Sequence, residues 1–135
     1  MTFYLIAQPL DYRPGSNRYE IIEIDGAHNF TKAHEAAGKW CARWGFTVQN
    51  ILSQEELDST QARGKHPGVM NYYGLYLNQN ANPMLKKLAD CMNFGEAEQL
   101  LRDAAPGTIY QVYHVIDELW LQDHAIDHNG REAHG

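Results

Sequence analysis

Hydrophobic and polar positions follow regular patterns along most of the chain, and the first of these patterns predicts a hairpin. Residues 2–9 and 18–25 are rich in the aliphatic and aromatic side chains that favour strands. Between them, Pro14 presets a turn dihedral and Gly15 tolerates a positive φ. We therefore expect two antiparallel strands joined by a loop over residues 11–17.

The clearest element is a helix over residues 30–44, whose apolar residues recur at the spacing of one helix face. Asn29 is placed to cap the first turn, and Gly45 is placed to end the helix in the left-handed conformation. The opposite face is charged, as a solvent-facing surface should be. The apolar stripe consists of Phe30, Ala33, Ala37, Trp40, Cys41 and Trp44.

Two further elements complete the first half of the chain. Residues 46–52 predict a third strand, and Ser53 with Glu56 forms a capping box that predicts a short helix. This helix must end before Gly64, because residues 65–68 interrupt any regular pattern.

The second half opens with a segment that periodicity does not decide, since residues 69–77 fit a helix and a strand equally well. Two short helices are then expected. Pro83 suits the first position of a helix over residues 83–91. Asn93 suits the cap of another helix, which Pro106-Gly107 would end.

Residues 108–116 are dense in β-branched and aromatic side chains, which favours a strand. The spacing of the apolar residues also allows a helix within 109–122, and this alternative stays open. From Asp123 onward the composition predicts a mobile acidic tail that contains histidines. The sequence shows no internal repeat, linker or low-complexity tract.

Together these elements predict an α+β fold with a single domain, residues 1–122, followed by the tail, residues 123–135. The hairpin and two further strands would form a small, mostly antiparallel sheet with helices packed on one face. Trp40 and Trp44 are expected to pack on this sheet. Strand order and oligomeric state stay open, a homo-oligomer included.

Composition indicates a globular protein of the cytoplasm, with 44% hydrophobic and 21% charged residues. Cys41 and Cys91 lie outside any C-x-x-C pattern, and we interpret them as buried thiols of a reducing compartment. The first residues lack the basic segment of a signal peptide, and no apolar run reaches the roughly 20 residues that span a bilayer. We expect no metal, disulfide or cofactor to be needed for folding.

Charge is distributed unevenly, and this changes the functional picture more than any motif does. Residues 1–87 carry nine Lys/Arg and eight Asp/Glu, whereas residues 88–128 carry eight acids and one base, Arg102. A surface of one sign attracts partners of opposite charge and disfavours polyanions. We therefore expect the acidic half to bind a larger protein with a basic surface, without direct contact to nucleic acid or a membrane. The acidic candidates are Glu96, Glu98, Asp103, Asp117, Glu118 and Asp123.

Tyr72, Tyr73 and Tyr76 form a second candidate contact surface, with several asparagines beside them. Tyrosine offers a large amphipathic contact area at a small cost in conformational entropy, and it is therefore common at interfaces. Packing of these tyrosines in the core explains the pattern equally well.

Motifs for catalysis are weak. His124 and His128 are four residues apart and, together with His114 and Glu118, could hold the metal ion of a small hydrolase. The chain has no H-E-x-x-H motif, so incidental histidines on an acidic tail are the simpler interpretation. Asp117 and Glu118 would point to opposite faces of a strand and would not converge on one substrate.

The leading hypothesis is a non-catalytic binding or inhibitor protein without a cofactor. In size, acidity and lack of motifs, the chain resembles the small inhibitors that phages and plasmids use against host defence systems, anti-CRISPR proteins among them. This resemblance is one of class and covers no particular residues. It implies a partner whose basic groove normally holds nucleic acid. The alternative hypothesis is the metal-dependent hydrolase.

Overall fold

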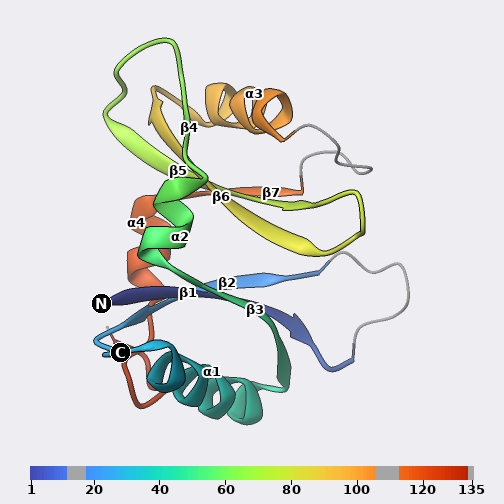
Figure 1. The fold of residues 1–135 in the computed structure, drawn as a ribbon, viewed down its shortest axis with the longest axis vertical. Helices are drawn as coiled ribbons and strands as arrows, with labels where there is room; N and C mark the ends of the chain where they lie inside the picture. Colours follow the sequence, from blue (N-terminus) through green and yellow to red (C-terminus); the bar gives the residue numbers. More distant parts are fainter. Residues whose placement is uncertain (12–17, 106–112, 134–135) are drawn as a thin grey trace. The chain divides into compact units, whose positions relative to one another are not determined.

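The predicted N-terminal hairpin forms the start of a three-stranded sheet. β1 (Thr2–Pro9) pairs antiparallel with β2 (Glu20–Asp25), and β3 (Phe46–Ser53) pairs antiparallel with the other edge of β1. The strand order is therefore β2-β1-β3. The structure is a computed structural model that describes residues 1–11, 18–105 and 113–133, and Figure 1 shows its elements. Most of the predicted hairpin loop, from residue 12 to residue 17, lies outside the described residues.

α1 (Phe30–Trp44) covers one face of this sheet, and both of its predicted caps are present (Figure 1). The Asn29 side chain accepts a hydrogen bond of 2.9 Å from a backbone N–H of the first turn, and Gly45 has a φ of 75°. Trp44, at the end of the apolar stripe, is 54% exposed. The expected packing of Trp44 on the sheet is therefore wrong. Trp40, one turn nearer the middle of the helix, is buried and stacks on an aromatic ring of β3.

The remaining elements complete two compact units of the chain. The elements after β3 are α2 (Gln54–Ser59), β4 (Ala62–Arg63), β5 (Met70–Leu77), β6 (Pro83–Cys91), α3 (Phe94–Ala104), β7 (His114–Asp117) and α4 (Glu118–Asp123). The first unit comprises Met1–Gln54 and Leu121–Gly135, and the second comprises Glu55–Trp120. The sheet of the second unit has the order β4-β6-β5-β7; β4 runs parallel to β6, and the other pairs are antiparallel.

Residues 83–91, which we predicted to be a short helix, form strand β6 instead. Leu85 and Leu88 are three positions apart and are 2% and 0% exposed, which imitates the stripe of a helix. In a strand this odd separation places the two side chains on opposite faces. Pro83 is the first residue of the strand, a position that tolerates proline. The prediction failed because both faces of β6 carry buried leucines.

The two segments that periodicity left open contain strands. Residues 70–77 form β5. The predicted strand at 108–116 is described only from residue 113 onward, and β7 begins at His114; residues 106–112 lie outside the described residues. Of the alternative helix within 109–122, the described residues contain only α4, which starts at Glu118. The predicted third strand, the short helix after Ser53 and the helix capped by Asn93 are confirmed as β3, α2 and α3.

The C-terminal segment, which we expected to be a mobile tail, makes specific contacts within the first unit. Ile126 is 1% exposed and forms a parallel bridge with Ile24 and an antiparallel bridge with Glu132. Its N–H donates to Glu23 O at 2.7 Å, and its carbonyl accepts from Asp25 N at 2.8 Å. The acidic composition concealed these contacts because a single isoleucine and its backbone make them.

The two units repeat one arrangement, although the sequence showed no internal repeat. Each unit has a hairpin, a helix and a third strand that pairs with the first strand of the hairpin, so that β2-β1-β3 corresponds to β6-β5-β7. In each unit a further segment runs parallel to the second strand, β4 beside β6 and Ile126 beside Ile24. The hairpin register is also equivalent. Phe3 pairs with Ile24 in the first unit, and the corresponding residues of the second unit, Tyr72 and Leu88, pair in the same way.

From β2 and β6 onward, equivalent residues lie 64 positions apart in the chain. Asn29 and Asn93 cap equivalent helices, and Leu57 and Leu121 are the buried residues of the two short helices. The cores use the same positions but mostly different side chains, and this difference hid the repeat from sequence inspection. Equivalent core pairs include Ile24 and Leu88, Ala33 and Ala97, Ala37 and Leu101, and Ile51 and Val115.

Candidate functional site

α3 gathers three of the acidic residues that the sequence assigned to partner binding. The Asn93 side chain caps this helix by accepting a hydrogen bond of 2.8 Å from a backbone N–H of the first turn. Ala97 and Leu101 form its buried face, which leaves the remaining positions to polar side chains. The acidic residues of the helix are Glu96, Glu98 and Asp103.

Local hydrogen bonds and one ion pair hold these carboxylates in place. Glu96 Oε2 accepts a bond of 3.1 Å from the backbone N–H of Met92, one residue before the position that donates in a capping box. Asp103 Oδ1 accepts a bond of 3.0 Å from a neighbouring glutamine side chain. Glu98 forms an ion pair of 3.6 Å with Arg102. Arg102 is the single base of α3, so the helix keeps a net negative charge.

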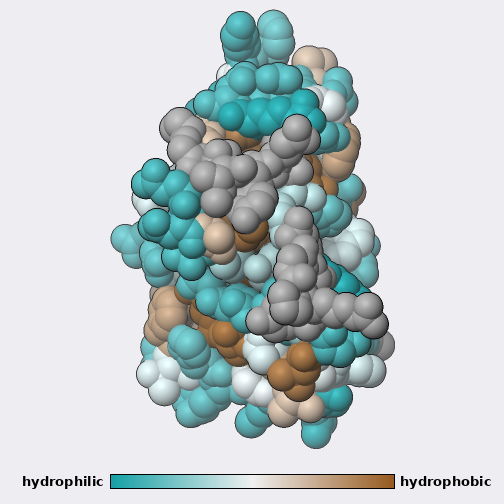
Figure 2. All heavy atoms as spheres, turned by 90° about the vertical axis from the view of Figure 1, so that its right-hand side faces the viewer, coloured by the Kyte–Doolittle hydropathy of each residue, from teal (hydrophilic) through white to brown (hydrophobic). Residues whose placement is uncertain are grey.

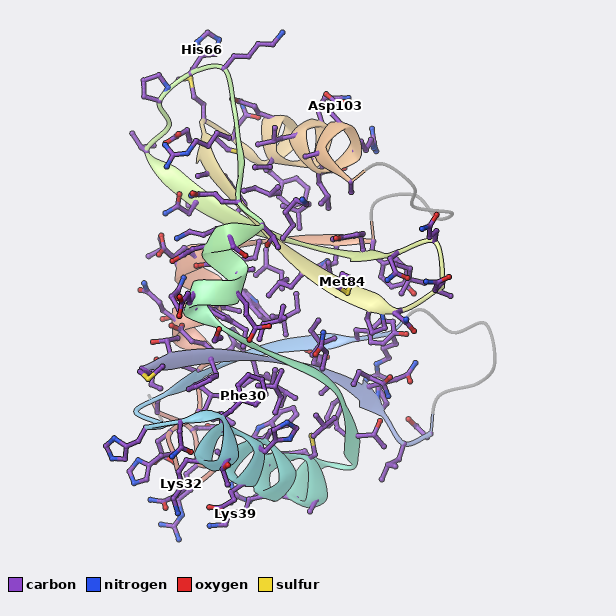
Figure 3. The ribbon with its side chains drawn as sticks, viewed as in Figure 1. Phe30, Lys32, Lys39, His66, Met84 and Asp103 are labelled. Atoms are coloured by element: carbon purple, nitrogen blue, oxygen red, sulfur yellow. The ribbon has the colours of Figure 1, made fainter. Side chains whose placement is uncertain are left out.

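A groove of about 390 Å³ lies between α3 and the loop that follows β4. The N–H of Gly64, at the start of the loop, donates to Ala89 O at 3.2 Å and anchors the loop to β6. Figure 3 shows Asp103 on the outer side of α3 and His66 at the tip of the loop. The groove thus has an acidic wall on α3 and a wall with basic side chains on the loop. Its lining residues are Gly64, Lys65, His66, Glu96, Gln99, Leu100 and Asp103.

The other three acidic candidates lie outside α3 and have local roles or a different location. Asp117 Oδ1 accepts a hydrogen bond of 2.6 Å from a backbone N–H of α4, so this residue caps α4. Glu118 accepts a bond of 3.4 Å from the Asn71 side chain. Asp123 is the last residue of α4 and belongs to the first unit. α3 is therefore the element that carries more of the acidic candidates than any other, whereas Glu118 and Asp123 lie at opposite ends of α4 and belong to different units.

The tyrosines that we considered for a contact surface are largely buried. Tyr72 is 5% exposed, lies in the core of the second unit and makes an edge contact with Phe94, with ring centroids 6.4 Å apart. Burial, and secondarily the Asp117 carboxylate, raises the pKa of Tyr72. Tyr73 is 2% exposed, and Tyr76 is half-buried with its pKa raised by burial. The surface interpretation is therefore wrong for Tyr72 and Tyr73, which are core residues.

Sequence reasoning missed exposed hydrophobic residues at the start of α3. Met92 is 59% exposed and Phe94 is 49% exposed. Val69, at 90% exposure, directly precedes Met70, which pairs with Cys91. Figure 2 shows one side of the molecule, on which hydrophilic residues predominate and hydrophobic residues form small separate patches. The spacing of Phe94 fits the apolar stripe of the helix, so its exposure could not be read from the sequence.

Chemistry based on metals or thiols finds no support among the described residues. In residues 1–11, 18–105 and 113–133, no group of three His, Cys, Asp or Glu side chains is arranged to hold a metal ion. Burial raises the pKa of the free thiols of Cys41 and Cys91 to about 11, so neither is a ready nucleophile at neutral pH. The described chain therefore does not assemble the alternative metal set of His114, Glu118, His124 and His128.

Comparison with known protein families, with curated proteins and with solved structures gives no match for this chain. Among the described residues, no helix combines the length and the apolar content that crossing a membrane requires. The charge and geometry of α3 and its groove therefore carry the functional inference.

Proposed function

We propose that this chain is a non-catalytic binding protein that docks through α3 on a basic surface of a larger protein. The observation that carries the proposal is the combination of acidic side chains on α3 with exposed hydrophobic residues beside them, Phe94 at the first position of the helix and Met92 just before its cap. Hydrophobic side chains that lose water on docking supply affinity, whereas charges around them select the partner and speed the encounter.

The groove beside α3 supports the proposal because it offers a place for a basic side chain of the partner. A lysine or arginine stem can lie along Leu100 while its charged end reaches Glu96 or Asp103. Lys65 on the loop wall disfavours a second cation there. We therefore expect a basic segment of the partner to bind along α3 and not along the loop.

A basic groove that ordinarily holds nucleic acid is the natural target for such a surface. Occupation of that groove would exclude the nucleic acid and would make this chain an inhibitor, as in the phage and plasmid inhibitors that it resembles in size and acidity. The partner, not this chain, would be the nucleic-acid-binding protein.

The test uses the wild-type chain and two charge-reversal variants as baits in a lysate of the source cells, with captured proteins identified by mass spectrometry. Glu98→Lys/Asp103→Lys reverses two charges on α3. Glu55→Lys/Glu132→Lys makes the same change at exposed positions elsewhere. Wild type and control should retain the partner, and the α3 variant should bind the purified partner at least roughly tenfold more weakly.

Ionic strength and nucleic acid provide independent readouts on the purified pair. Affinity should fall steeply as salt rises toward about 0.5 M, because screening shortens the range of the attraction. Excess nucleic acid should displace the chain. Equal binding of the wild type and the folded α3 variant, or an affinity indifferent to salt, would contradict the proposal.

A further inference from the structure

A second groove lies in the first unit, between the last turns of α1 and the C-terminal turn that follows Ile126. Its volume is about 640 Å³. The groove gathers three cationic side chains, and none of its lining residues is acidic. The lining residues are Lys39, Ala42 and Arg43 of α1 and Asn129 and Arg131 of the turn.

The three cations are exposed and are not neutralised by ion pairs. Among the ion pairs within the described residues, none includes Lys39, Arg43 or Arg131. The nearby Asp127 carboxylate accepts backbone hydrogen bonds of 2.8 Å from Asn129 N and 3.1 Å from Arg131 N. Its attraction to the Arg131 charge is only a minor cause of its lowered pKa. The cationic groups are therefore available to a dissolved anion.

The turn that presents Arg131 is fixed against α1. Asp127 N donates to Arg131 O at 2.7 Å, and Gly130 N donates to Asp127 O at 3.0 Å. Gly130 has a φ of 75°, and a methyl group on it would lie 2.7 Å from Ala36 O and 2.9 Å from Lys39 Cβ. Glycine permits this close approach. The backbone thus sets the spacing between Arg131 and the cations of α1.

The internal repeat strengthens the distinction between the two grooves. Lys39 occupies the position equivalent to Asp103. Lys32, which lies seven residues earlier on α1, is equivalent to Glu96. Figure 3 shows Lys39 and Asp103 each on the outer side of its helix, away from the sheet of its unit. One scaffold therefore carries a cationic groove in the first unit and an acidic wall in the second, which indicates ligands of opposite charge.

We infer that the cationic groove binds a small, multiply charged oxyanion of the phosphate class. Arg43 and Arg131 can each donate paired hydrogen bonds to phosphate oxygens, and Lys39 adds a third positive charge. The dipole of α1 places only about half a negative elementary charge at the C-terminal end of the helix, and the three positive side chains outweigh its repulsion of an anion. The net charge of −6 disfavours an extended polyanion, so the ligand is a small phosphate compound and not a nucleic acid.

The test is a titration of ¹⁵N-labelled protein with sodium pyrophosphate, followed by NMR at constant ionic strength. Saturable shifts should be confined to the amides of Lys39, Ala42, Arg43 and residues 127–131. Arg43→Gln/Arg131→Gln should weaken binding at least tenfold. Arg18→Gln/Lys32→Gln removes the same charge at exposed positions outside the groove and should change the dissociation constant less than twofold.

Several results would overturn the inference. These are the absence of shifts, shifts spread over the basic residues of both units, and equal affinity of the wild type and the groove variant. Tighter binding of a dodecathymidylate than of pyrophosphate at the same amides would assign the groove to nucleic acid instead. If the double variant loses its fold by circular dichroism, Lys39→Gln serves in its place, with a smaller loss of affinity expected.

Discussion

At the residue scale, the cores of the two units have the same architecture but carry their large side chains on different elements. The first unit uses Leu5 on β1 and Ala37 on α1, and the equivalent positions in the second unit are Gly74 and Leu101. A methyl group on Gly74 would lie 2.5 Å from Leu101 Cδ2, which is closer than carbon atoms can approach. The large side chain has thus changed from the strand to the helix, and the space between them stays filled.

This exchange predicts that Gly74→Ala has opposite effects in two backgrounds. In the wild type, overpacking against Leu101 should cost about 1–3 kcal/mol of unfolding free energy. In Leu101→Ala, which itself should cost about 2–5 kcal/mol, the added methyl group fills part of the cavity and should be neutral or stabilising. Urea denaturation of the four chains measures the cycle. Gly38→Ala, where a methyl group meets no atom within 4 Å apart from its chain neighbours and its own helix backbone, is the control for a glycine replaced without overpacking. Equal costs in both backgrounds would show that the pair does not share this space.

At the element scale, the turn at residues 127–131 shows how a segment of polar composition becomes part of the fold. The Asp127 carboxylate accepts backbone hydrogen bonds from Arg131 and Asn129, while Gly130 rests on α1. The bond from Arg131 N is the main cause that lowers the pKa of Asp127 below its ordinary value. The ionised side chain is therefore coupled to the folded turn.

Asp127→Asn should destabilise the protein at pH 7 and have a progressively smaller effect at low pH. Because the pKa is depressed in the folded state, the stabilisation is fully present above the ordinary aspartate value of about 4 and is lost as pH falls through the folded-state pKa. Urea titrations between pH 7 and pH 3 should show the gap between wild type and variant closing at the acidic end. Gly130→Ala should instead give a loss that varies little over this range. A pH-independent gap for Asp127→Asn would refute this coupling.

At the scale of the whole molecule, the first unit requires both ends of the chain. The chain enters the second unit after Gln54 and returns to the first at Leu121. Ile126 then lies parallel to Ile24 of β2, in the position that β4 has beside β6 in the second unit. A residue near the C-terminus therefore adds a bridge to the edge of a sheet whose first strand begins at Thr2.

Ile126→Ala should consequently cost about 2–5 kcal/mol of unfolding free energy, the range for large buried aliphatic residues. Leu119→Ala, at a side chain that is 61% exposed, should change stability by less than about 0.5 kcal/mol. Urea denaturation at pH 7 distinguishes the two. A segment that only trails in solvent would give the same negligible change for both variants.

The candidate functional groups were predicted from the sequence only where one element carries them. The acidic residues of α3 were found because charge and helical spacing are both local properties. The cationic groove escaped notice because Arg131 lies 92 residues after Lys39 and meets it only in the folded chain. Likewise, Phe94 has the spacing of a buried residue, and only the structure shows that it is exposed.

The sequence by itself determined the hairpin, α1, β3 and the caps at Asn29 and Asn93, together with the acidic character of α3. These features depend on dihedral preferences and hydrogen bonds among residues a few positions apart. The tertiary structure decided that residues 83–91 form a strand, that Ile126 joins the first unit and that the fold is repeated. Each of these depends on which faces become buried and on partners distant in the chain, which local spacing does not encode.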